Sequence, residues 1–196
     1  METTDNFRKH THKNPIQRFL LGNFYKHVFS LLKTVQINSI LDVGCGEGFT
    51  LHKLEEQKIG KKLEGIEYNK TAIALGKKQY PKLTIKQGSI YELPYKANSF
   101  DLVLCTEVLE HMDNPKKALK ELVRVSNKYV LLSVPNEPFF MLAQLLRGKN
   151  WSRFGNDIEH INHWSFLSFQ KFVSSSVKIQ SIRIPFFWTI ILGVKK

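Results

Sequence analysis

Two carboxylates and a glycine-rich turn carry the clearest chemical signal in the sequence. Asp42 lies near the end of the apolar run 38–43, and glycines follow at positions 44, 46 and 48. Glycine adopts positive φ readily and has no Cβ, so a ligand can approach such a turn closely. Glu67 ends the next apolar run, where a carboxylate can accept hydrogen bonds from both hydroxyls of a ribose. This combination predicts a nucleoside-binding site.

The spacing of the glycines narrows the kind of nucleoside. The dinucleotide-binding fingerprint needs a further glycine three positions after its second one, and position 49 is Phe. The pattern therefore argues against a nicotinamide or flavin enzyme. Taken alone, the turn could equally be a plain strand-to-helix connection and Glu67 a solvated strand end, but the segments that follow disfavour that alternative.

Two further segments follow in order along the chain. The predicted strand 83–87 leads into Gly88-Ser-Ile-Tyr-Glu-Leu-Pro94, and the predicted strand 99–105 leads into Thr106-Glu-Val-Leu-Glu-His-Met112. With them, residues 37–136 resemble the class I S-adenosylmethionine-dependent methyltransferases. The likeness is to the small-molecule (type 11, ubiquinone-biosynthesis-like) group, with its "DVGCGxG" loop and "EVLEH" segment. It implies S-adenosylmethionine as cofactor, S-adenosylhomocysteine as product and a small-molecule acceptor methylated on O, N or C.

The resemblance also implies a set of cofactor-binding residues. The loop after the first strand would wrap the methionine and ribose, Glu67 would bind the ribose hydroxyls, and Tyr68 would pack beside the adenine. Relatives usually carry Asp where this chain has Ser89, so a hydroxyl or the backbone would make that adenine contact. The matching positions are Asp42, Gly44, Cys45, Gly46, Glu67, Tyr68, Gly88, Ser89, Ile90, Thr106 and Glu107.

The chemistry itself demands less of the sequence. Methyl transfer from a sulfonium is an in-line displacement, so much of the catalysis can come from alignment of the nucleophile. A hydroxyl acceptor would need a general base, and His111 and His163 are our candidates, with His160 close by in sequence. The resemblance places the stretch 160–166 beside the substrate cavity. A helix-entry role for His111 and a surface loop for the other histidines stay open as alternatives.

Two alternative functions follow from the same residues. Glu107, Glu110, His111 and His163 resemble the metal-ligand set of small-RNA 2′-O-methyltransferases, and carboxylates with imidazoles would suit a divalent ion. Because the Glu-Val-Leu-Glu-His segment also occurs in relatives without a metal, we expect no metal site. A noncatalytic cofactor-binding module is the third reading, which the intact Asp42 and Glu67 speak against.

Composition predicts a single domain. A chain of 196 residues with 42% apolar content can bury one full core. We expect residues 1–36 to form a helical segment that caps the active site and residues 37–196 to form the methyltransferase domain. The resemblance implies a Rossmann-like doubly wound α/β sheet of seven strands, mostly parallel with the last strand antiparallel, and helices on both faces.

The elements expected from the sequence alternate along the chain. Helices are predicted to begin at Pro15, near Phe49, after Asn69 and after Asn114, and another spans 166–174. Strands are predicted at 38–43, 62–67, 83–87, 99–105 and 129–134, with a closing pair at 177–184 and 188–194. In a sheet of this kind ligands bind outside the carboxyl ends of the strands, where each motif lies.

Charge and targeting signals bear on partners. The net charge of +12 comes from scattered Lys and Arg, which indicates a solvated basic surface with weak attraction to nucleic acids or anionic membranes. The apolar stretch 139–146, followed by Arg147, Lys149, Trp151, Arg153 and Phe154, could pack on the sheet, line an apolar pocket or rest on a membrane. We expect no transmembrane segment, no signal peptide and a cytoplasmic location; nothing in the sequence indicates an oligomeric state.

Overall fold

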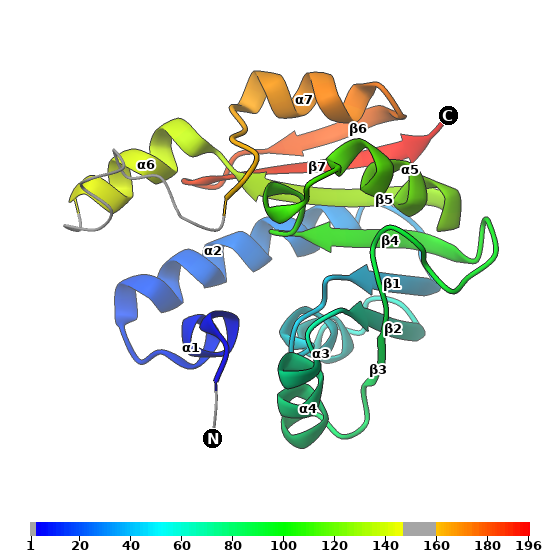
Figure 1. Cartoon of the computed structure of the whole chain (residues 1–196), viewed down its shortest axis with the longest axis horizontal. Helices are drawn as coiled ribbons and strands as arrows, with labels where there is room; N and C mark the ends of the chain where they lie inside the picture. The colour runs from blue at the N-terminus through cyan, green and yellow to red at the C-terminus, as the bar shows by residue number, and fades with distance from the viewer. Residues whose placement is uncertain (1–2, 147–159) are drawn as a thin grey trace.

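A seven-stranded sheet forms the centre of the computed structural model, which describes residues 3–146 and 160–196. The strand order is β3-β2-β1-β4-β5-β7-β6. All strands run parallel except β7, which is antiparallel to both β5 and β6 (Figure 1). The predicted fold class is confirmed. The strands are β1 (Ser39–Val43), β2 (Lys62–Glu67), β3 (Thr84–Gln87), β4 (Phe100–Thr106), β5 (Ser126–Pro135), β6 (Val177–Arg183) and β7 (Trp188–Lys195).

Most helices begin where the capping residues predict. Asn14 accepts a hydrogen bond from the Ile16 N–H, and Asn69 and Asn114 cap their helices in the same way. The short first helix, capped by Thr4, was not predicted, because Phe7 is its single apolar residue and gives no periodic apolar signal. The helices are α1 (Asp5–Thr11), α2 (Pro15–Leu32), α3 (Phe49–Glu56), α4 (Lys70–Gln79), the 3₁₀ turn η1 (Leu109–His111), α5 (Pro115–Val125), α6 (Glu137–Leu146) and α7 (Phe166–Ser174).

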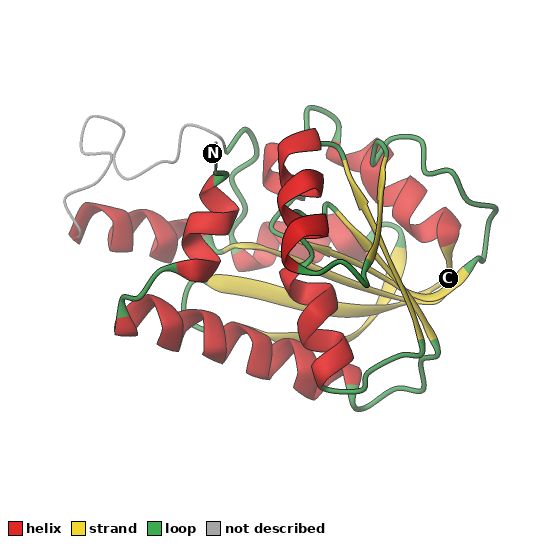
Figure 2. Ribbon diagram, turned by 90° about the horizontal axis from the view of Figure 1, so that it is seen from below, coloured by secondary structure: helices red, strands yellow, loops and turns green. Residues whose placement is uncertain are grey.

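Helices cover both faces of the sheet (Figure 2). On one face, α2 packs its buried side chains against Ile40, Leu102 and Leu104, and the buried residues of α3 and α4 lie on the same side. On the other face, α5 and α7 pack against Val103 and Val130. The central strands β4 and β5 are buried on both faces, which explains why their sequences are almost continuously apolar instead of alternating.

The parallel strands bring the candidate residues to one edge of the sheet. The carboxyl ends of β1, β2, β4 and β5 meet there, so the segments 44–48, 67–69, 106–112 and 136–137 lie on a common rim. The antiparallel β7 starts at the same rim, since Trp188 pairs with Pro135. Side chains from distant parts of the sequence can therefore face one another at this edge.

Two features of the described helices bear on contact with a membrane. No helix in the two described ranges is long and apolar enough to cross a bilayer. Helix α6 forms over the predicted apolar stretch, and the Phe139 side chain is 56% exposed. The cations and aromatics that follow, Arg147 to Phe154, lie outside the described residues, so the interfacial interpretation of this stretch stays a prediction.

Substitution by alanine should have opposite effects on stability at two helical glycines. A Cβ on Gly22 in α2 would meet no atom within 4 Å, whereas a Cβ on Gly76 in α4 would lie 2.6 Å from the backbone oxygen of Glu47. We expect Gly22→Ala to stabilise the fold by up to about 1 kcal/mol through helix propensity. Gly76→Ala should destabilise it by about 1–3 kcal/mol, because the glycine loop must shift. Urea unfolding of both variants measures this, and a Gly76→Ala protein as stable as Gly22→Ala would contradict the packing described.

Candidate active site

The glycine loop, residues 44–48, is tied to the end of β2. The N–H groups of Gly44 and Cys45 donate to the Ile66 oxygen at 2.8 and 3.2 Å, and the Gly46 N–H donates to Oε2 of Glu67 at 2.8 Å. Gly44 and Gly46 have φ values of +76° and +54°, which residues with a side chain rarely adopt. A Cβ on Gly44 would come within 2.4 Å of the Val108 side chain. The loop therefore packs closely against the Val108 side chain while fixing the Glu67 carboxylate.

Asp42 is a buried carboxyl group without a hydrogen-bond donor. Its side chain is 1% exposed, and neither oxygen has a partner in the described part of the chain. Burial raises the pKa of Asp42 to about 7, and the nearby charge of Glu67 adds to the effect. An unpaired buried acceptor destabilises a fold unless a ligand supplies the donor. Asp42 thus points to a ligand that carries a cation or a proton donor.

The segment predicted to hold an adenine lies next to Glu67. The Gly88 N–H donates to the Glu67 backbone oxygen at 3.0 Å, and Ile90 is buried in the core. The Ser89 hydroxyl accepts the Tyr91 N–H at 3.2 Å, and the Tyr68 side chain is 77% exposed. The structure brings the segment to the predicted place, while the direct contacts of Tyr68 and Ser89 with a base stay predictions.

Thr106 ends β4 at the same rim, and the next residue, Glu107, braces three strands. Its backbone has φ of +58°, an uncommon conformation for a residue with a side chain, and its N–H donates to the Ser133 oxygen. Its carboxylate accepts hydrogen bonds from the Ser133 hydroxyl at 2.8 Å and from Nε1 of Trp188 at 2.7 Å. Burial raises the pKa of Glu107. Both oxygens are thus engaged by β5 and β7, a role that was not predicted.

A cluster of acidic and imidazole groups lies just beyond Glu107. Potential ligand atoms of Glu110, His111 and His160 lie within 4.8 Å of one another. Glu110 is 1% exposed, and burial, followed by the charge of Glu107, raises its pKa well above the ordinary value. Nδ1 of His160 lies 2.6 Å from Oε1 of Glu137, a buried carboxyl group at the start of α6.

The segment after residue 160 is pinned to the turn that follows β4. The N–H groups of Ile161 and Asn162 donate to the Glu110 oxygen at 2.9 Å, and the Asn162 side chain donates to the Met112 oxygen at 2.7 Å. This arrangement separates the candidate bases. His111 faces Glu110 and His160, whereas His163 lies at the rim, 46% exposed, with Nδ1 3.8 Å from Glu137.

The predicted metal-ligand set is therefore not assembled as the resemblance implied. His160 takes the place expected for His163, and Glu107 is engaged by Trp188. The sequence interpretation missed Glu137. It follows the end of β5 directly, so the position that singled out Glu67 and Glu107 could also have singled out this carboxylate.

Helix α1 and its N-cap contact the glycine loop through side-chain hydrogen bonds. The Thr4 hydroxyl and the Asn6 amide both donate to the carboxylate of Glu47, which is fully buried. The His10 ring stacks on Phe49 at 4.3 Å with an interplanar angle of 8°. Burial lowers the pKa of His10 to about 3, with Lys9 and Lys53 contributing, so the ring is neutral at pH 7.

Comparisons with known proteins agree with this geometry. Residues 41–132 match the family model described as a methyltransferase domain, which spans the glycine loop, β2, β4 and most of β5. Together with the curated relatives, this match supports a class I S-adenosylmethionine-dependent methyltransferase. In this chain the glycine loop, the acidic residue Glu67 and the rim all lie at the carboxyl ends of the strands.

Three relatives of this methyltransferase are informative. The mitochondrial ubiquinone biosynthesis O-methyltransferase of Saccharomyces cerevisiae is 36% identical, over 42% of this chain and 28% of that protein. Norajmaline N-methyltransferase of Rauvolfia serpentina is 36% identical, over 54% and 35%. The small RNA 2′-O-methyltransferase of Rattus norvegicus is 26% identical, over 83% and 44%. The chain spans less than half the length of these curated relatives.

Solved structures share the fold. A protein of Pyrococcus horikoshii superposes with a TM-score of 0.76 at 15% identity and covers 100% of both chains. Magnesium protoporphyrin IX methyltransferase of Synechocystis, with bound S-adenosylhomocysteine, gives a TM-score of 0.70 at 15% identity and covers 93% of this chain and 88% of that one. At such identities the likeness concerns the fold alone.

The residues of this methyltransferase fit its cofactor, S-adenosylmethionine. Asp42 offers two buried oxygens without a partner in the described residues, and these suit an ammonium group. Glu67 is fixed by backbone N–H donors from Gly46 and Asn69, and each oxygen retains acceptor capacity for a hydroxyl.

The raised pKa of Asp42 predicts an unusual pH dependence of stability. Between pH about 4 and about 7 the unfolded chain has lost this proton while the folded chain keeps it, so stability falls as pH rises through that window. Asp42→Asn should therefore increase the free energy of unfolding of the ligand-free protein at pH 8 by at most about 4 kcal/mol, which raises its melting temperature, and should change little at pH 4. It should also weaken S-adenosylmethionine binding.

Asp101 provides a control of opposite sign. Its carboxylate accepts the Asn38 and Ser39 N–H groups, and the first of these bonds is the main cause that lowers its pKa. Asp101→Asn should destabilise the protein at pH 8, since the charged acceptor is lost. Melting curves from pH 4 to 8 and calorimetric titration with S-adenosylmethionine measure both effects. Parallel pH profiles for Asp42→Asn and the unmutated protein would contradict our account of the buried carboxyl group.

Proposed function

We propose that this chain transfers the methyl group of S-adenosylmethionine to an oxygen or nitrogen nucleophile of a small molecule. The observation that carries the proposal is the buried, donor-free carboxyl group of Asp42 beside a loop that fixes Glu67. Two relatives, an O-methyltransferase of ubiquinone biosynthesis and an N-methyltransferase acting on norajmaline, support small-molecule acceptors. Transfer to carbon is the third chemistry that the family fold accommodates.

The proposed mechanism divides the work between binding and proton removal. The bound cofactor supplies a methyl group on a positively charged sulfur, which makes the carbon electrophilic. Asp42 would bind the ammonium group of the cofactor's amino-acid part, and Glu67, fixed by the loop, would bind the hydroxyls of its ribose. The acceptor is aligned at the rim near Thr106, where positioning lowers the barrier. His111, or His163 from the segment that follows residue 160, takes the proton of a hydroxyl acceptor.

We propose that residues 1–36 cap this site and that residues 37–196 form the catalytic domain. Support for the cap comes from the contacts of Thr4 and Asn6 with Glu47, which fasten α1 against the glycine loop. The Lys9 ammonium also lies 5.7 Å from the centre of the Trp188 ring, next to the Glu107 brace. A cap of this kind excludes water from the reacting atoms, which strengthens the electrostatic contacts inside.

Label transfer tests the activity and the acceptor class together. We expect S-adenosylmethionine with a radiolabelled methyl group to label the small-molecule fraction of a cell extract incubated with the protein. Whichever of His111→Ala and His163→Ala removes the general base should lower turnover by about 10²-fold or more, because a general base contributes that much to rate. Cofactor affinity should not change, since neither histidine belongs to the glycine loop.

His27→Ala is the matched control for both histidine variants. His27 lies on α2, with Nδ1 2.8 Å from the Asn23 oxygen, and has no place in the proposed mechanism. Full activity in His27→Ala and in both site variants would remove His111 and His163 from the mechanism. If the unmutated protein fails to bind S-adenosylmethionine in calorimetry, the proposed function itself fails.

A second candidate function, metal-assisted RNA 2′-O-methylation, has one specific observation in its favour. Glu110, His111 and His160 converge tightly enough to hold a divalent ion, and the small RNA 2′-O-methyltransferase of the rat aligns with 83% of this chain. A divalent ion there would hold the hydroxyls of a terminal ribose. The cluster lies beside the end of β4, next to Glu107.

The structure and the family resemblance differ in which histidine would bind the ion. If the second candidate holds, Mn²⁺ should bind with one ion per chain, and His160→Ala should weaken it at least about tenfold while His163→Ala leaves it unchanged. The resemblance predicts the reverse order for these two variants. Calorimetric titration with Mn²⁺ measures this, and no stoichiometric binding by the unmutated protein would exclude the metal-assisted mechanism.

A further inference from the structure

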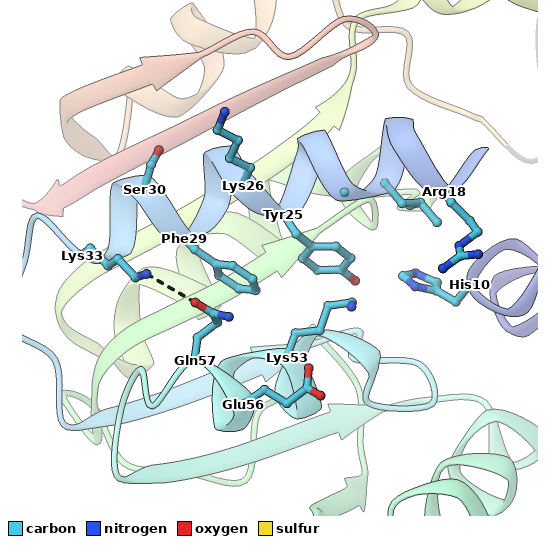
Figure 3. Close-up of a pocket in the computed structure, with 12 residues that line it drawn as sticks. His10, Arg18, Tyr25, Lys26, Phe29, Ser30, Lys33, Lys53, Glu56 and Gln57 are labelled. Carbon is cyan, nitrogen blue, oxygen red and sulfur yellow. Dashed lines mark hydrogen bonds between the residues drawn. The ribbon is translucent and has the colours of Figure 1, made fainter. Parts of the chain in front are cut away.

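A basic groove lies between α2 and α3, apart from the glycine loop. The cavity has a volume of about 770 Å³, and none of the loop residues 44–48 lines it. Figure 3 shows its side chains, which include four cations: Arg18 and Lys26 from α2, Lys33 from the C-cap of α2, and Lys53 from α3. Its acidic side chain, Glu56, lies 3.6 Å from Nε2 of His52. We call this feature the α2–α3 groove.

The cations on α2 form a row. Arg18, Lys26 and Lys33 are separated by eight and seven residues, so they lie within about 80° of one another around the helix axis. Figure 3 shows Lys26 at the outer edge of the groove, pointing away from Phe29 and Lys53. At 1.5 Å per residue the row extends about 22 Å. In the described part of the chain neither Arg18 nor Lys26 has an ion-pair partner, and Lys33 donates to the neutral Gln57 amide at 3.3 Å. A row of this length suits several successive negative charges better than one phosphate group.

Aromatic rings form the wall between the cations. The Tyr25 and Phe29 rings stack with centroids 5.7 Å apart and planes 24° apart. Tyr25 is buried, with its hydroxyl 3.3 Å from Oγ1 of Thr50 and the Lys53 ammonium 5.1 Å from its ring centre. Phe29 is half-buried and lines the groove. Next to these rings, Gly22 leaves open space where a side chain would lie.

We propose that the α2–α3 groove binds single-stranded nucleic acid. The cations would contact successive phosphates, and a base would stack on the open part of Phe29, the combination that strand-binding grooves use irrespective of sequence. A flat bilayer cannot follow a concave surface, and the exposed apolar side chains of α2, Ile16 and Phe19, do not line the groove. This proposal does not rest on the proposed methyl transfer.

The groove leads toward the active-site cap. His10 of α1 lines its end beside Arg18, and the same ring stacks on Phe49 at the start of α3, directly after the glycine loop. A strand in the groove would therefore extend from Lys33 toward α1 (Figure 3).

Charge reversal tests the row of cations. The probe is a fluorescein-labelled oligouridine of about ten nucleotides, and its anisotropy is measured with the full chain over a range of salt concentrations. Arg18→Glu combined with Lys26→Glu should weaken binding at least about tenfold and reduce the slope of log affinity against log salt by about two. The control, Lys116→Glu with Lys120→Glu, makes the same charge change on α5, on the other face of the sheet. It should retain most of the affinity.

Gly22 and Phe29 test the wall of the groove. Gly22→Glu places a carboxylate in open space, so it should weaken binding about tenfold without loss of folding. Phe29→Ala should weaken it about fivefold or more with an unchanged salt slope. Cofactor binding by the Arg18/Lys26 and Gly22 variants, measured by calorimetry, should equal that of the unmutated protein. This readout separates failure of the groove proposal from failure of the methyltransferase proposal.

Four results would overturn the proposal. Absence of binding at low salt excludes the site, and equal losses in the α2 and α5 double variants show a uniform attraction to polyanions. Competition by uridine monophosphate as effective as that of the oligonucleotide assigns the groove to a mononucleotide. Capture by anionic phosphatidylserine vesicles that is lost in the Arg18→Glu, Lys26→Glu protein, with no effect of these changes on the oligonucleotide, assigns it to a membrane.

Discussion

Three hydrogen bonds between the glycine loop and the end of β2 determine the geometry of the whole candidate site. They join the N–H groups of Gly44, Cys45 and Gly46 to the Ile66 oxygen and the Glu67 carboxylate. Because they hold Glu67 beside Asp42, they also contribute to the raised pKa of Asp42. The same bonds direct the chain into α3 and place the Glu47 side chain in the interior. There its carboxylate accepts hydrogen bonds from Thr4 and Asn6 of the N-terminal segment. Cofactor binding and the position of α1 therefore depend on one short turn.

The molecule separates its charges in space although its net charge is +12. Asp42, Glu107, Glu110 and Glu137 all lie at the carboxyl edge of the sheet, and three of them have an oxygen without a partner in the described ranges. Burial of so many carboxyl groups is unfavourable unless protons, cations or donors compensate it. This edge therefore suits a sulfonium, an ammonium group or a metal ion, whereas the α2–α3 groove suits anions. As proposed, the two sites would select ligands of opposite charge within one domain.

The sequence was informative where function depends on neighbouring residues. The glycine loop, Asp42 and Glu67 were predictable because a turn and its two strands lie within 26 residues, from 42 to 67. The sheet and its reversed last strand followed from the family resemblance, and the helix starts from Asn caps at positions 14, 69 and 114. In contrast, the partner of Glu107 is Trp188, and His160 rather than His163 joins Glu110 and His111. These pairings depend on the position of the antiparallel β7 and on the hydrogen bonds that hold the segment after residue 160 against the turn that follows β4. No local sequence pattern encodes either of them. The α2–α3 groove was missed for the same reason, since its cations looked scattered along the chain.

Helix α1 is the element through which the two sites can influence each other. Its His10 ring contacts both the groove and Phe49, Lys9 lies over Trp188, and Asn6 contacts the glycine loop through Glu47. If a ligand binds the groove more tightly when α1 occupies one particular position, its binding increases the population of that position. Because α1 also contacts the glycine loop, the surroundings of the cofactor site change with it. Linkage then requires the reverse effect, so that the cofactor changes the affinity of the groove by the same factor. The strength of this coupling is limited by the few contacts that α1 makes, because each exchanged hydrogen bond contributes only about 1 kcal/mol. A methyltransferase built in this way can respond to a polyanion without any residue that touches both ligands.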